Sequence, residues 1–188
     1  DGTTTTDGGS IPFTNPSTGA IYLISANAFS TVTGTLELWD VLWVNSGIVV
    51  TTTTGQTINS VTWPARDVNG STNGEGVNVA IVATAATTNV GAVTNTNGTA
   101  SRTATMPSTI PGGGWPATAV IGTVQPFYLA AGDRGVRSIQ TVTLGTSYGG
   151  GSISLIAYRP IILVPQMTAS VPAYGIVPEM TPGIRLFN

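Results

Sequence analysis

The chain has 188 residues and a formal net charge of −2, and only 7% of its residues are charged, against about 25% in soluble domains. It contains no histidine and no cysteine, which excludes histidine-based catalysis, thiolate chemistry, disulfides and the zinc sites that these residues build. It has no lysine either, and its six arginines are scattered, so the clustered positive charge that nucleic-acid binding requires is missing.

Hydrophobic residues make up 41% of the chain. Disordered chains combine low hydrophobicity with high charge, so we expect ordered structure here. The 24 glycines and 12 prolines favour short strands joined by many turns. The longest apolar stretch, residues 153–165, is interrupted by Arg159 and Pro160 and is too short to cross a hydrocarbon layer of about 30 Å. We therefore expect no membrane and no nucleic acid as a partner, and no cofactor.

The first 19 residues differ in composition from the rest. Glycine, threonine and proline dominate residues 1–19, and only Ile11 and Phe13 are apolar enough to anchor them. This composition predicts an extended N-terminal arm that reaches a neighbouring subunit. Residues 20–160 instead alternate apolar and polar residues in short segments without helical periodicity, which predicts a β-domain.

The strands predicted for this β-domain are short and regularly spaced. We expect them at residues 21–29, 34–43, 56–63, 76–87, 90–96, 99–106, 119–130, 136–146 and 152–158. The clearest is 76–87, where alternate residues from Val77 to Ala83 fall on one face that we expect to be buried. Asn97-Gly98 and residues 132–135 supply turn sequences. The pattern predicts an all-β fold, a jelly-roll-like antiparallel β-sandwich.

The last segment, residues 161–188, is rich in proline and in apolar residues. Proline fits neither a helix interior nor a central strand. This composition predicts an extended C-terminal tail that crosses a surface, such as that of a partner. The expected organisation is therefore an arm, a β-sandwich domain at 20–160, and a tail.

Paired carboxylates can hydrolyse a glycosidic bond, and the candidates here are Glu37, Asp40, Glu75 and Asp133. Glu37 and Asp40 lie three positions apart, so on one strand they point to opposite faces. Edge charge and turn capping explain these residues better than catalysis. We expect no catalytic residue and no metal ligand. A glycan-cleaving enzyme would instead show hydrolysis that falls when one of these carboxylates is replaced.

Tryptophans that stack on sugar rings would suit a carbohydrate-binding module. Trp39 and Trp43 share a strand face with Val41, so a buried apolar stripe explains both. Trp115 lies within the glycine- and proline-rich segment 111–116, which places it on a loop. It is the candidate glycan contact if the chain binds sugar.

Two further patterns have structural explanations. The threonine runs at 3–6 and 51–54 lack the regular repeat of an ice-binding surface, and the β-propensity of threonine explains them. Residues 69–71 and 97–99 match the acceptor pattern for N-glycosylation. Both contain Asn-Gly, which tight turns also require, and we interpret them as turns.

Two stretches, GTLELWDVLW at 34–43 and AGDRGVRSIQTVTL at 131–144, resemble the virion structural proteins of tailed bacteriophages. That family has an early leucine-tyrosine-aspartate-arginine-leucine-tryptophan strand, a threonine-asparagine hairpin, and a Gly-Asp-x-Gly-Val-Arg-Ser turn before a final strand ending near Arg-Pro. The matching residues occur in the same order: Leu38, Asp40, Leu42, Trp43, Thr94, Asn95, Ser101, Arg102, Thr103, Gly132 to Ser138, Tyr158, Arg159 and Pro160. The chain departs from the pattern at Trp39, Val41 and Val93.

The resemblance implies a jelly-roll domain of the capsid decoration, or cement, type, located on the outer surface of the virion head. Its partners are then the major capsid protein and further copies of itself in a homotrimer. The candidate assembly contacts are residues of the arm, the first strand and the tail: Phe13, Ile21, Tyr174, Ile176, Arg185, Leu186 and Phe187. The alternative is a phage tail, fibre or spike component that binds a host glycan through Trp115 and the loop at 69–75.

Overall fold

The computed structural model describes residues 14, 16–85, 104, 106, 121–145, 147, 149–176 and 184–186, with the backbone alone at 84, 85, 176 and 184–186. These residues contain no helix. They form ten strands: β1 (Ile21–Leu23), β2 (Ser25–Ala28), β3 (Gly34–Asn45), β4 (Gln56–Thr57), β5 (Asn78–Ala85), β6 (Val124–Pro126), β7 (Thr141–Val142), β8 (Ser152–Gln166), β9 (Ala173–Ile176) and β10 (Ile184–Leu186). The all-β prediction is confirmed.

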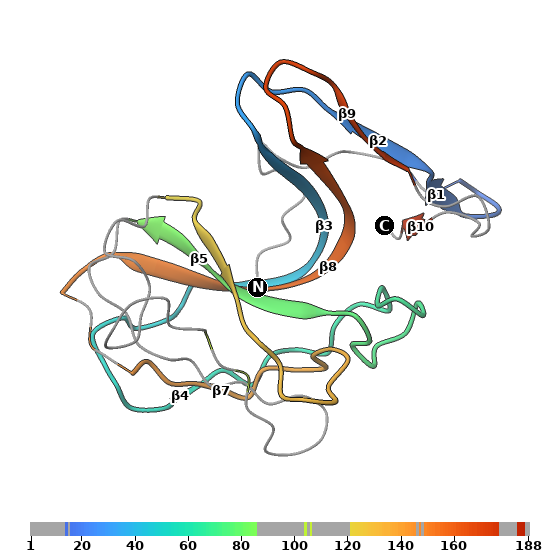
Figure 1. Ribbon diagram of the computed structural model, residues 1–188. Helices are drawn as coiled ribbons and strands as arrows, with labels where there is room; N and C mark the ends of the chain where they lie inside the picture. The colour runs from blue at the N-terminus through green and yellow to red at the C-terminus, as the bar shows by residue number, and fades with distance from the viewer. Residues whose placement is uncertain are drawn as a thin grey trace. The chain divides into compact units, whose positions relative to one another are not determined.

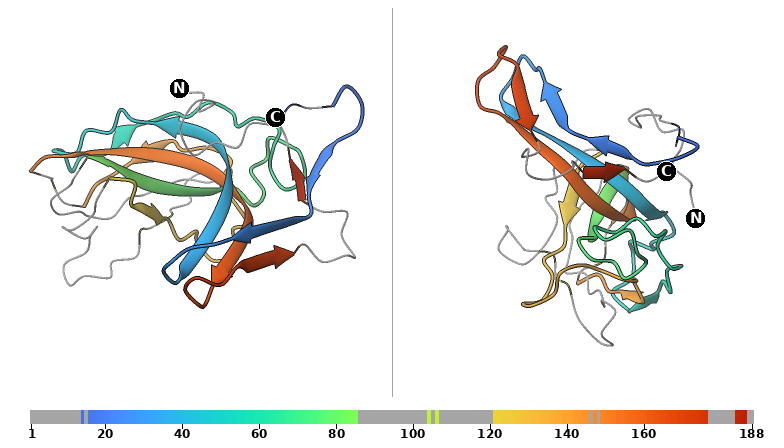
Figure 2. Two further views of the ribbon diagram at one scale, coloured as in Figure 1. Left: turned by 90° about the horizontal axis from the view of Figure 1, so that it is seen from above. Right: turned by 90° about the vertical axis from the view of Figure 1, so that its right-hand side faces the viewer.

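Two compact units divide the chain. The first, which we call the core unit, is built mainly from Val41–Arg159, and the second, the ribbon unit, from Thr4–Asp40 and Pro160–Asn188. Strands β3 and β8 pass from one unit into the other, and they lie side by side in a four-stranded sheet with the order β3-β8-β5-β6 (Figures 1 and 2). Residues 20–40, which the sequence assigns to the β-domain, therefore group with the C-terminal segment.

The sheet of the core unit is antiparallel and buries one regular face. Strand β5 pairs with β8 from Asn78 opposite Tyr158 onwards, and with β6 from Ala80 opposite Pro126. The alternating residues from Val77 to Ala83 are fully buried, as the period of two in the sequence predicts. Strand β8 lies between β3 and β5, and its residues 153–159 are all buried, as expected for a central strand.

A second layer faces this sheet. The short β4–β7 ladder continues through hydrogen bonds from the Ile58 amide to the Gln140 carbonyl at 2.8 Å and from the Ser60 amide to the Ile139 carbonyl at 2.9 Å. Its apolar side chains join those of the sheet in one buried cluster, which includes Trp63 and Val142. This two-layer arrangement is sandwich-like. The jelly-roll order of the strands stays a prediction.

Two tryptophans belong to this core. The ring centroids of Trp43 and Trp63 lie 5.5 Å apart at an interplanar angle of 48°. Trp63 is 2% exposed, and its indole Nε1 donates a hydrogen bond to the Val136 carbonyl at 2.6 Å. The core role predicted for Trp43 is confirmed. Because the buried indole N–H has an acceptor, Trp63 enters the core without an unsatisfied donor.

The ribbon unit joins the two ends of the chain. Strand β1 pairs antiparallel with β10, from Ile21 opposite Leu186 to Leu23 opposite Ile184. Strand β2 pairs antiparallel with β9, with Asn27 opposite Tyr174. The sequence predicts an extended tail from residue 161, whereas in the structure β8 continues to Gln166 and two later segments form ladders. Residues 1–13 of the predicted arm lie outside the described part of the chain.

Strand β8 tolerates its prolines because its pairing with β5 ends before they occur. The last β5–β8 pair is Asn78 with Tyr158, so β8 has no β5 neighbour at Pro160 or Pro165. A proline there removes no ladder hydrogen bond on the β5 side, as at the edge of a sheet. The proline-rich composition thus marks the place where a central strand becomes an edge.

Small residues let the β2–β9 ladder pack closely on β8. A Cβ atom at Gly175 would lie 2.8 Å from Val164 Cγ2 and 3.0 Å from Ile162 Cδ1. Ala26 and Gly175 are opposite each other in the ladder, as are Ala28 and Ala173, and all four are half-buried. Val164 is fully buried. The ladder therefore presents a face of small side chains to β8, where larger ones would not fit.

Candidate interaction surface

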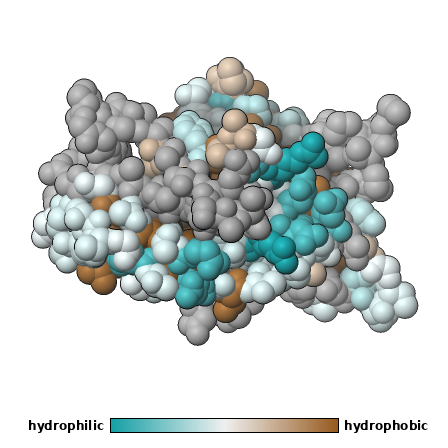
Figure 3. Space-filling model, turned by 90° about the horizontal axis from the view of Figure 1, so that it is seen from below, coloured by the Kyte–Doolittle hydropathy of each residue, from teal (hydrophilic) through white to brown (hydrophobic). Residues whose placement is uncertain are grey.

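Exposed apolar side chains are concentrated in the ribbon unit. Among the described residues, nine large apolar side chains of this unit are exposed: Tyr22, Ile24, Phe29, Val32, Leu36, Leu163, Met167, Val171 and Tyr174. The larger core unit has five: Val49, Val61, Val68, Ile121 and Tyr128. On the face drawn in Figure 3, apolar residues lie as separate patches between hydrophilic ones.

The ribbon unit buries little of its own apolar surface. Val164 is its one buried apolar side chain within the described residues, whereas all the other buried ones belong to the core unit. A two-stranded ladder is at best marginally stable in water unless it packs against something else. A large exposed apolar surface usually marks a place where another molecule binds. The ribbon unit is therefore the candidate interaction surface of this chain.

One part of this surface lies on the two ladders. We call Tyr22, Ile24 and Tyr174 the ribbon surface; they are 44%, 68% and 68% exposed. Tyr174 stands opposite Asn27, which is also exposed, so this pair faces away from the small residues that pack on β8. Tyrosine offers a large apolar ring with a polar tip, a combination that is enriched at protein interfaces.

The other part lies where the chain turns back, in the β2–β3 and β8–β9 connections. We call Phe29, Val32, Met167 and Val171 the tip surface; they are 65%, 67%, 83% and 51% exposed. The two connections contain no charged residue. No motif in the sequence marks these four residues, although apolar residues flanked by serine, threonine and proline in a loop are a signal that could have found them.

A buried amide holds the two connections together. Gln166 is 4% exposed, and its Nε2 donates to the Ser30 carbonyl at 2.6 Å and to the Thr168 carbonyl at 3.4 Å. The Ser170 amide donates to the same Ser30 carbonyl at 2.8 Å, and Ser170 has a φ of 59°, which is uncommon outside glycine. These bonds tie the β2–β3 and β8–β9 connections to each other.

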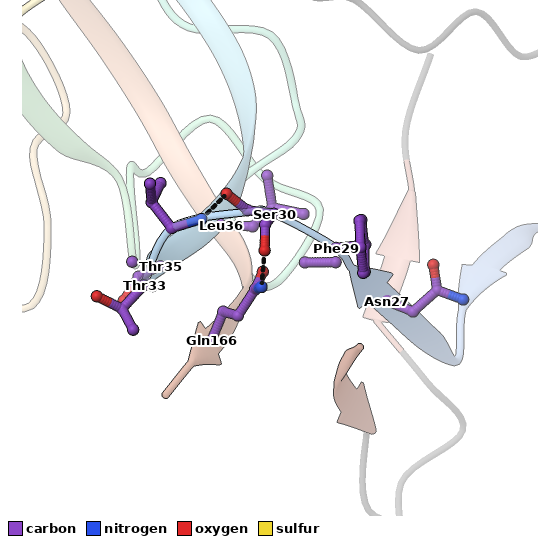
Figure 4. A pocket seen from close by; sticks show the side chains of 10 residues that line it. Asn27, Phe29, Ser30, Thr33, Thr35, Leu36 and Gln166 are labelled. Atoms are coloured by element: carbon purple, nitrogen blue, oxygen red, sulfur yellow. Dashed lines mark hydrogen bonds between the residues drawn. The ribbon is translucent and has the colours of Figure 1, made fainter. Parts of the chain in front are cut away.

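A hollow of about 430 Å³ adjoins the tip surface (Figure 4). It is lined by Asn27, Ala28, Phe29, Ser30, Val32, Thr33, Gly34, Thr35, Leu36 and Gln166. Its lining carries no charge and combines apolar side chains with hydroxyls and two amides. Most ligand pockets are mainly apolar with a few polar groups, and this chemistry suits an uncharged, largely apolar group.

The structure groups the predicted contact residues into the two ladders. Ile21 is half-buried in β1, opposite Leu186, and Arg185 pairs with Tyr22. Tyr174 is exposed in β9, and Ile176 pairs with Ser25 at the end of the same ladder. Phe13, Phe187 and Trp115 lie outside the described residues. The described strands thus bring tail residues and residues of the first predicted strand together.

The candidate carboxylates fall in two places: Glu37 and Asp40 lie on β3, and Glu75 and Asp133 lie on two segments that a bridge between Glu75 and Gly135 brings together. Glu37 is exposed on β3, and Asp40 is half-buried further along the same strand. Glu75 Oε1 lies 3.9 Å from Arg134 Nη1, an exposed pair that contributes little to stability. Asp133 is half-buried in the turn before Arg134.

Within the described residues no group of three or more acidic, histidine or cysteine side chains could hold a metal ion, and no helix is long and apolar enough to span a membrane.

The loop at 69–75, the other candidate glycan contact, is organised by Asp67. Its Oδ1 accepts hydrogen bonds from the amides of Asn69 at 2.9 Å and Ser71 at 2.7 Å, and its Oδ2 accepts from the Ser71 hydroxyl at 2.6 Å and the Glu75 amide at 3.2 Å. Gly70 has a φ of 71°, and its amide donates to the Asp67 carbonyl. The turn predicted at Asn69-Gly70 is confirmed.

Burial and hydrogen bonding shift the pKa of the Asp67 carboxyl in opposite directions. Burial raises the pKa of Asp67, but hydrogen bonds from the Ser71 side chain and from three backbone amides outweigh burial and hold the pKa below its usual value of 3.8. Asp67 is 1% exposed, and both of its oxygens are used inside the loop. Its role here is to hold the loop together.

Comparison with known proteins gives no relative: no protein-family model, no curated protein and no solved structure matches this chain.

Proposed function

We propose that this chain is a capsid decoration, or cement, protein of a tailed bacteriophage, which binds the outer surface of the head as a homotrimer and stabilises the shell. Two lines support the proposal. One is the resemblance carried by residues 34–43 and 131–144. The other is the division of the chain into a unit with its own buried core and a ribbon unit without one. A jelly-roll order for the strands of the core unit is part of this proposal.

The single observation that carries the proposal is the exposed apolar surface of the ribbon unit. Removing apolar surface from water contributes about 25 cal/mol per Å². Covering nine side chains that are 41–83% exposed would therefore stabilise a complex substantially. A protein whose function is to adhere to another protein assembly gains this stabilisation when the surface is covered.

The ribbon surface is the proposed contact with the major capsid protein. Its tyrosines and Ile24 would supply the buried centre of each contact, joined by Ile21 and by the tail residues that pair with the first strands. Each contact is modest in size, but many copies bound to one shell act together through avidity. Because only Arg185 among the predicted contacts is charged, attachment should depend little on salt.

The test is the stoichiometry of this chain relative to the major capsid protein in purified particles, measured by quantitative mass spectrometry. Hundreds of copies per particle support a shell-covering role. A few copies, or tens, contradict it and favour the tail, fibre or spike alternative, in which glycan binding becomes the question. Particles that lack the protein should also lose their genome at a lower temperature than complete particles do.

A further inference from the structure

We propose that Asn73 is a modification site, at which the folded chain converts an asparagine to aspartate and isoaspartate by its own chemistry, whereas the fold protects Asn69. The inference concerns the core unit and is independent of the capsid role. It starts from the loop at 69–75, whose sequence contains Asn-Gly twice, at 69–70 and at 73–74. A third Asn-Gly, at 97–98, lies outside the described residues.

The reaction needs only groups of the chain and water. The backbone nitrogen of the glycine attacks the side-chain carbonyl carbon of the asparagine, and the side-chain nitrogen leaves as ammonia, carrying the proton of the glycine amide. Water then opens the cyclic imide at one of its two carbonyls, which gives aspartate or isoaspartate. Glycine favours ring closure, because it has no side chain to obstruct the approach and its backbone reaches more conformations than that of other residues.

The two asparagines offer equivalent side chains. Asn69 and Asn73 are both exposed, and within the described part of the chain neither side-chain amide has a hydrogen-bond partner. The backbone amide of each donates to a side-chain oxygen two residues earlier, from Asn69 to Asp67 Oδ1 at 2.9 Å and from Asn73 to Ser71 Oγ at 3.2 Å. The carbon that is attacked is therefore similarly accessible at both sites, and the glycine nitrogen decides between them.

The two glycine amides differ in their hydrogen bonding. The Gly70 amide donates to the Asp67 carbonyl at 2.9 Å, so attack on Asn69 requires this turn to open first. The Asp67 carboxylate opposes that opening, because it accepts hydrogen bonds from three other amides of the same loop. The Gly74 amide donates to none of the residues that the structure describes. Its nitrogen can therefore attack Asn73 without the loss of a hydrogen bond.

The product would disturb the place where Gly74 packs. Gly74 is buried, and a Cβ atom built on it would overlap the Val136 carbonyl, so the backbone has no spare room here. Isoaspartate lengthens the backbone by one carbon directly before Gly74, whereas aspartate keeps its length. We therefore expect isoaspartate at position 73 to lower the stability of the core unit. Because Gly74 is shielded from water, conversion should be slower in the folded protein than in the unfolded chain.

The experiment incubates the full-length protein in mildly alkaline buffer, both folded and in denaturant. Tandem mass spectrometry of its peptides follows each asparagine, and labelling by an isoaspartyl methyltransferase distinguishes isoaspartate from aspartate. In denaturant the two sites should convert at similar rates. In the folded protein Asn73 should convert about fivefold faster than Asn69, the factor that one hydrogen bond accounts for. Equal rates in the folded protein, faster conversion of Asn69, or a folded protein in which neither site converts would each overturn the proposal.

Two variants test the effect of the product on stability. Asn73→Asp carries the charge of the product on a backbone of normal length, and Asn73→Gln has a longer side chain that closes the ring far more slowly. In denaturant unfolding, the aged wild type should have a lower midpoint than the fresh wild type, while fresh Asn73→Asp and aged Asn73→Gln should match the fresh wild type. An equal loss in aged Asn73→Gln would place the damage elsewhere. An unchanged midpoint in converted wild type would contradict the strain at Gly74.

Discussion

Two buried polar residues show how single side chains organise this protein. Asp67 gathers the loop at 69–75 around its carboxylate, and Gln166 joins the two connections that form the tip surface. Each is nearly inaccessible to water; both carboxylate oxygens of Asp67 accept hydrogen bonds, and Gln166 Nε2 donates to two carbonyls, in keeping with the need of buried polar groups for partners. In both cases hydrogen bonds of a side chain hold irregular backbone in place where no strand pairing does so.

Replacing Asp67 with asparagine should destabilise the core unit by about 2 kcal/mol, because hydrogen bonds to a charged group are among the stronger ones in proteins. The asparagine amide group would also place N–H donors beside donors of the loop. Denaturant unfolding of the full chain measures the change in the free energy of unfolding. Glu37→Gln is the control, since it removes an exposed carboxylate and should change stability by less than about 0.5 kcal/mol. Equal stability of the two variants would contradict the role given to Asp67.

Acid should weaken this loop. The pKa of Asp67 is lowered in the folded state, so the unfolded chain binds a proton more readily, and the free energy of unfolding falls as the pH falls. The contribution is complete above the usual value of 3.8 and is lost as the pH passes down through the lowered pKa. Unfolding measured from pH 6 to pH 2 should show a smaller pH dependence for Asp67→Asn than for the wild type. Identical slopes would show that Asp67 is not the responsible group.

At the scale of the strands, the ribbon unit depends on small residues. The β2–β9 ladder lies close to β8 because Gly175 has no side chain at its point of contact with Val164 and Ile162. Ala26, which is opposite Gly175, is also small. Such close packing leaves the larger side chains of the ladder, Tyr174 among them, on the outer face. The exposed apolar surface is therefore a consequence of how the ladder packs.

Gly175→Val should separate the ladder from β8, because overpacking of this kind costs about 1–3 kcal/mol and the ladder has little other stabilisation. Hydrogen exchange measures the effect: amides of β2 and β9 should lose protection, while those of β5 keep theirs. Gly150→Val is the control, since a Cβ atom at Gly150 meets no atom within 4 Å. Unchanged exchange in β2 and β9 would show that the ladder does not need this contact.

At the scale of the whole molecule, the two units differ in how much of their apolar surface they bury. The core unit buries its apolar side chains in one cluster and can stabilise itself. The ribbon unit exposes most of its large apolar side chains, and covering them would add to its stability. The chain thus combines a unit with its own buried core and a unit with an exposed apolar surface, and strands β3 and β8 connect them covalently.

Tyr174→Asp should reduce binding to particles by about tenfold or more, because a charge would replace a ring at the proposed centre of the contact. Co-sedimentation with particles that lack the protein measures the retained fraction. Tyr128→Asp is a closely matched control: Tyr128 is 63% exposed against 68% for Tyr174, and it lies in the core unit. Equal losses for both variants, or none for either, would contradict the assignment of the contact to the ribbon surface.

Local patterns in the sequence determine the β character of this protein and much of its core. The alternation from Val77 to Ala83 and the turn at Asn69-Gly70 depend on neighbours in the chain, and both are found as predicted. The absence of histidine, cysteine and lysine likewise excludes whole classes of chemistry whatever the fold. These conclusions need only the periodicity of a strand and the conformations open to each residue.

Pairing between distant segments cannot be predicted from local patterns. Whether Ser25 meets Ile176, or Asn27 meets Tyr174, depends on contacts between residues far apart in the chain, and no local pattern encodes such partners. Proline at 160 and 165 indicates an extended tail when it is considered alone, but β8 accommodates both because its β5 neighbour ends at Asn78. The ribbon unit, its exposed apolar surface and its hollow therefore emerge only when the two ends of the chain are brought together, because burial is a property of the packed molecule.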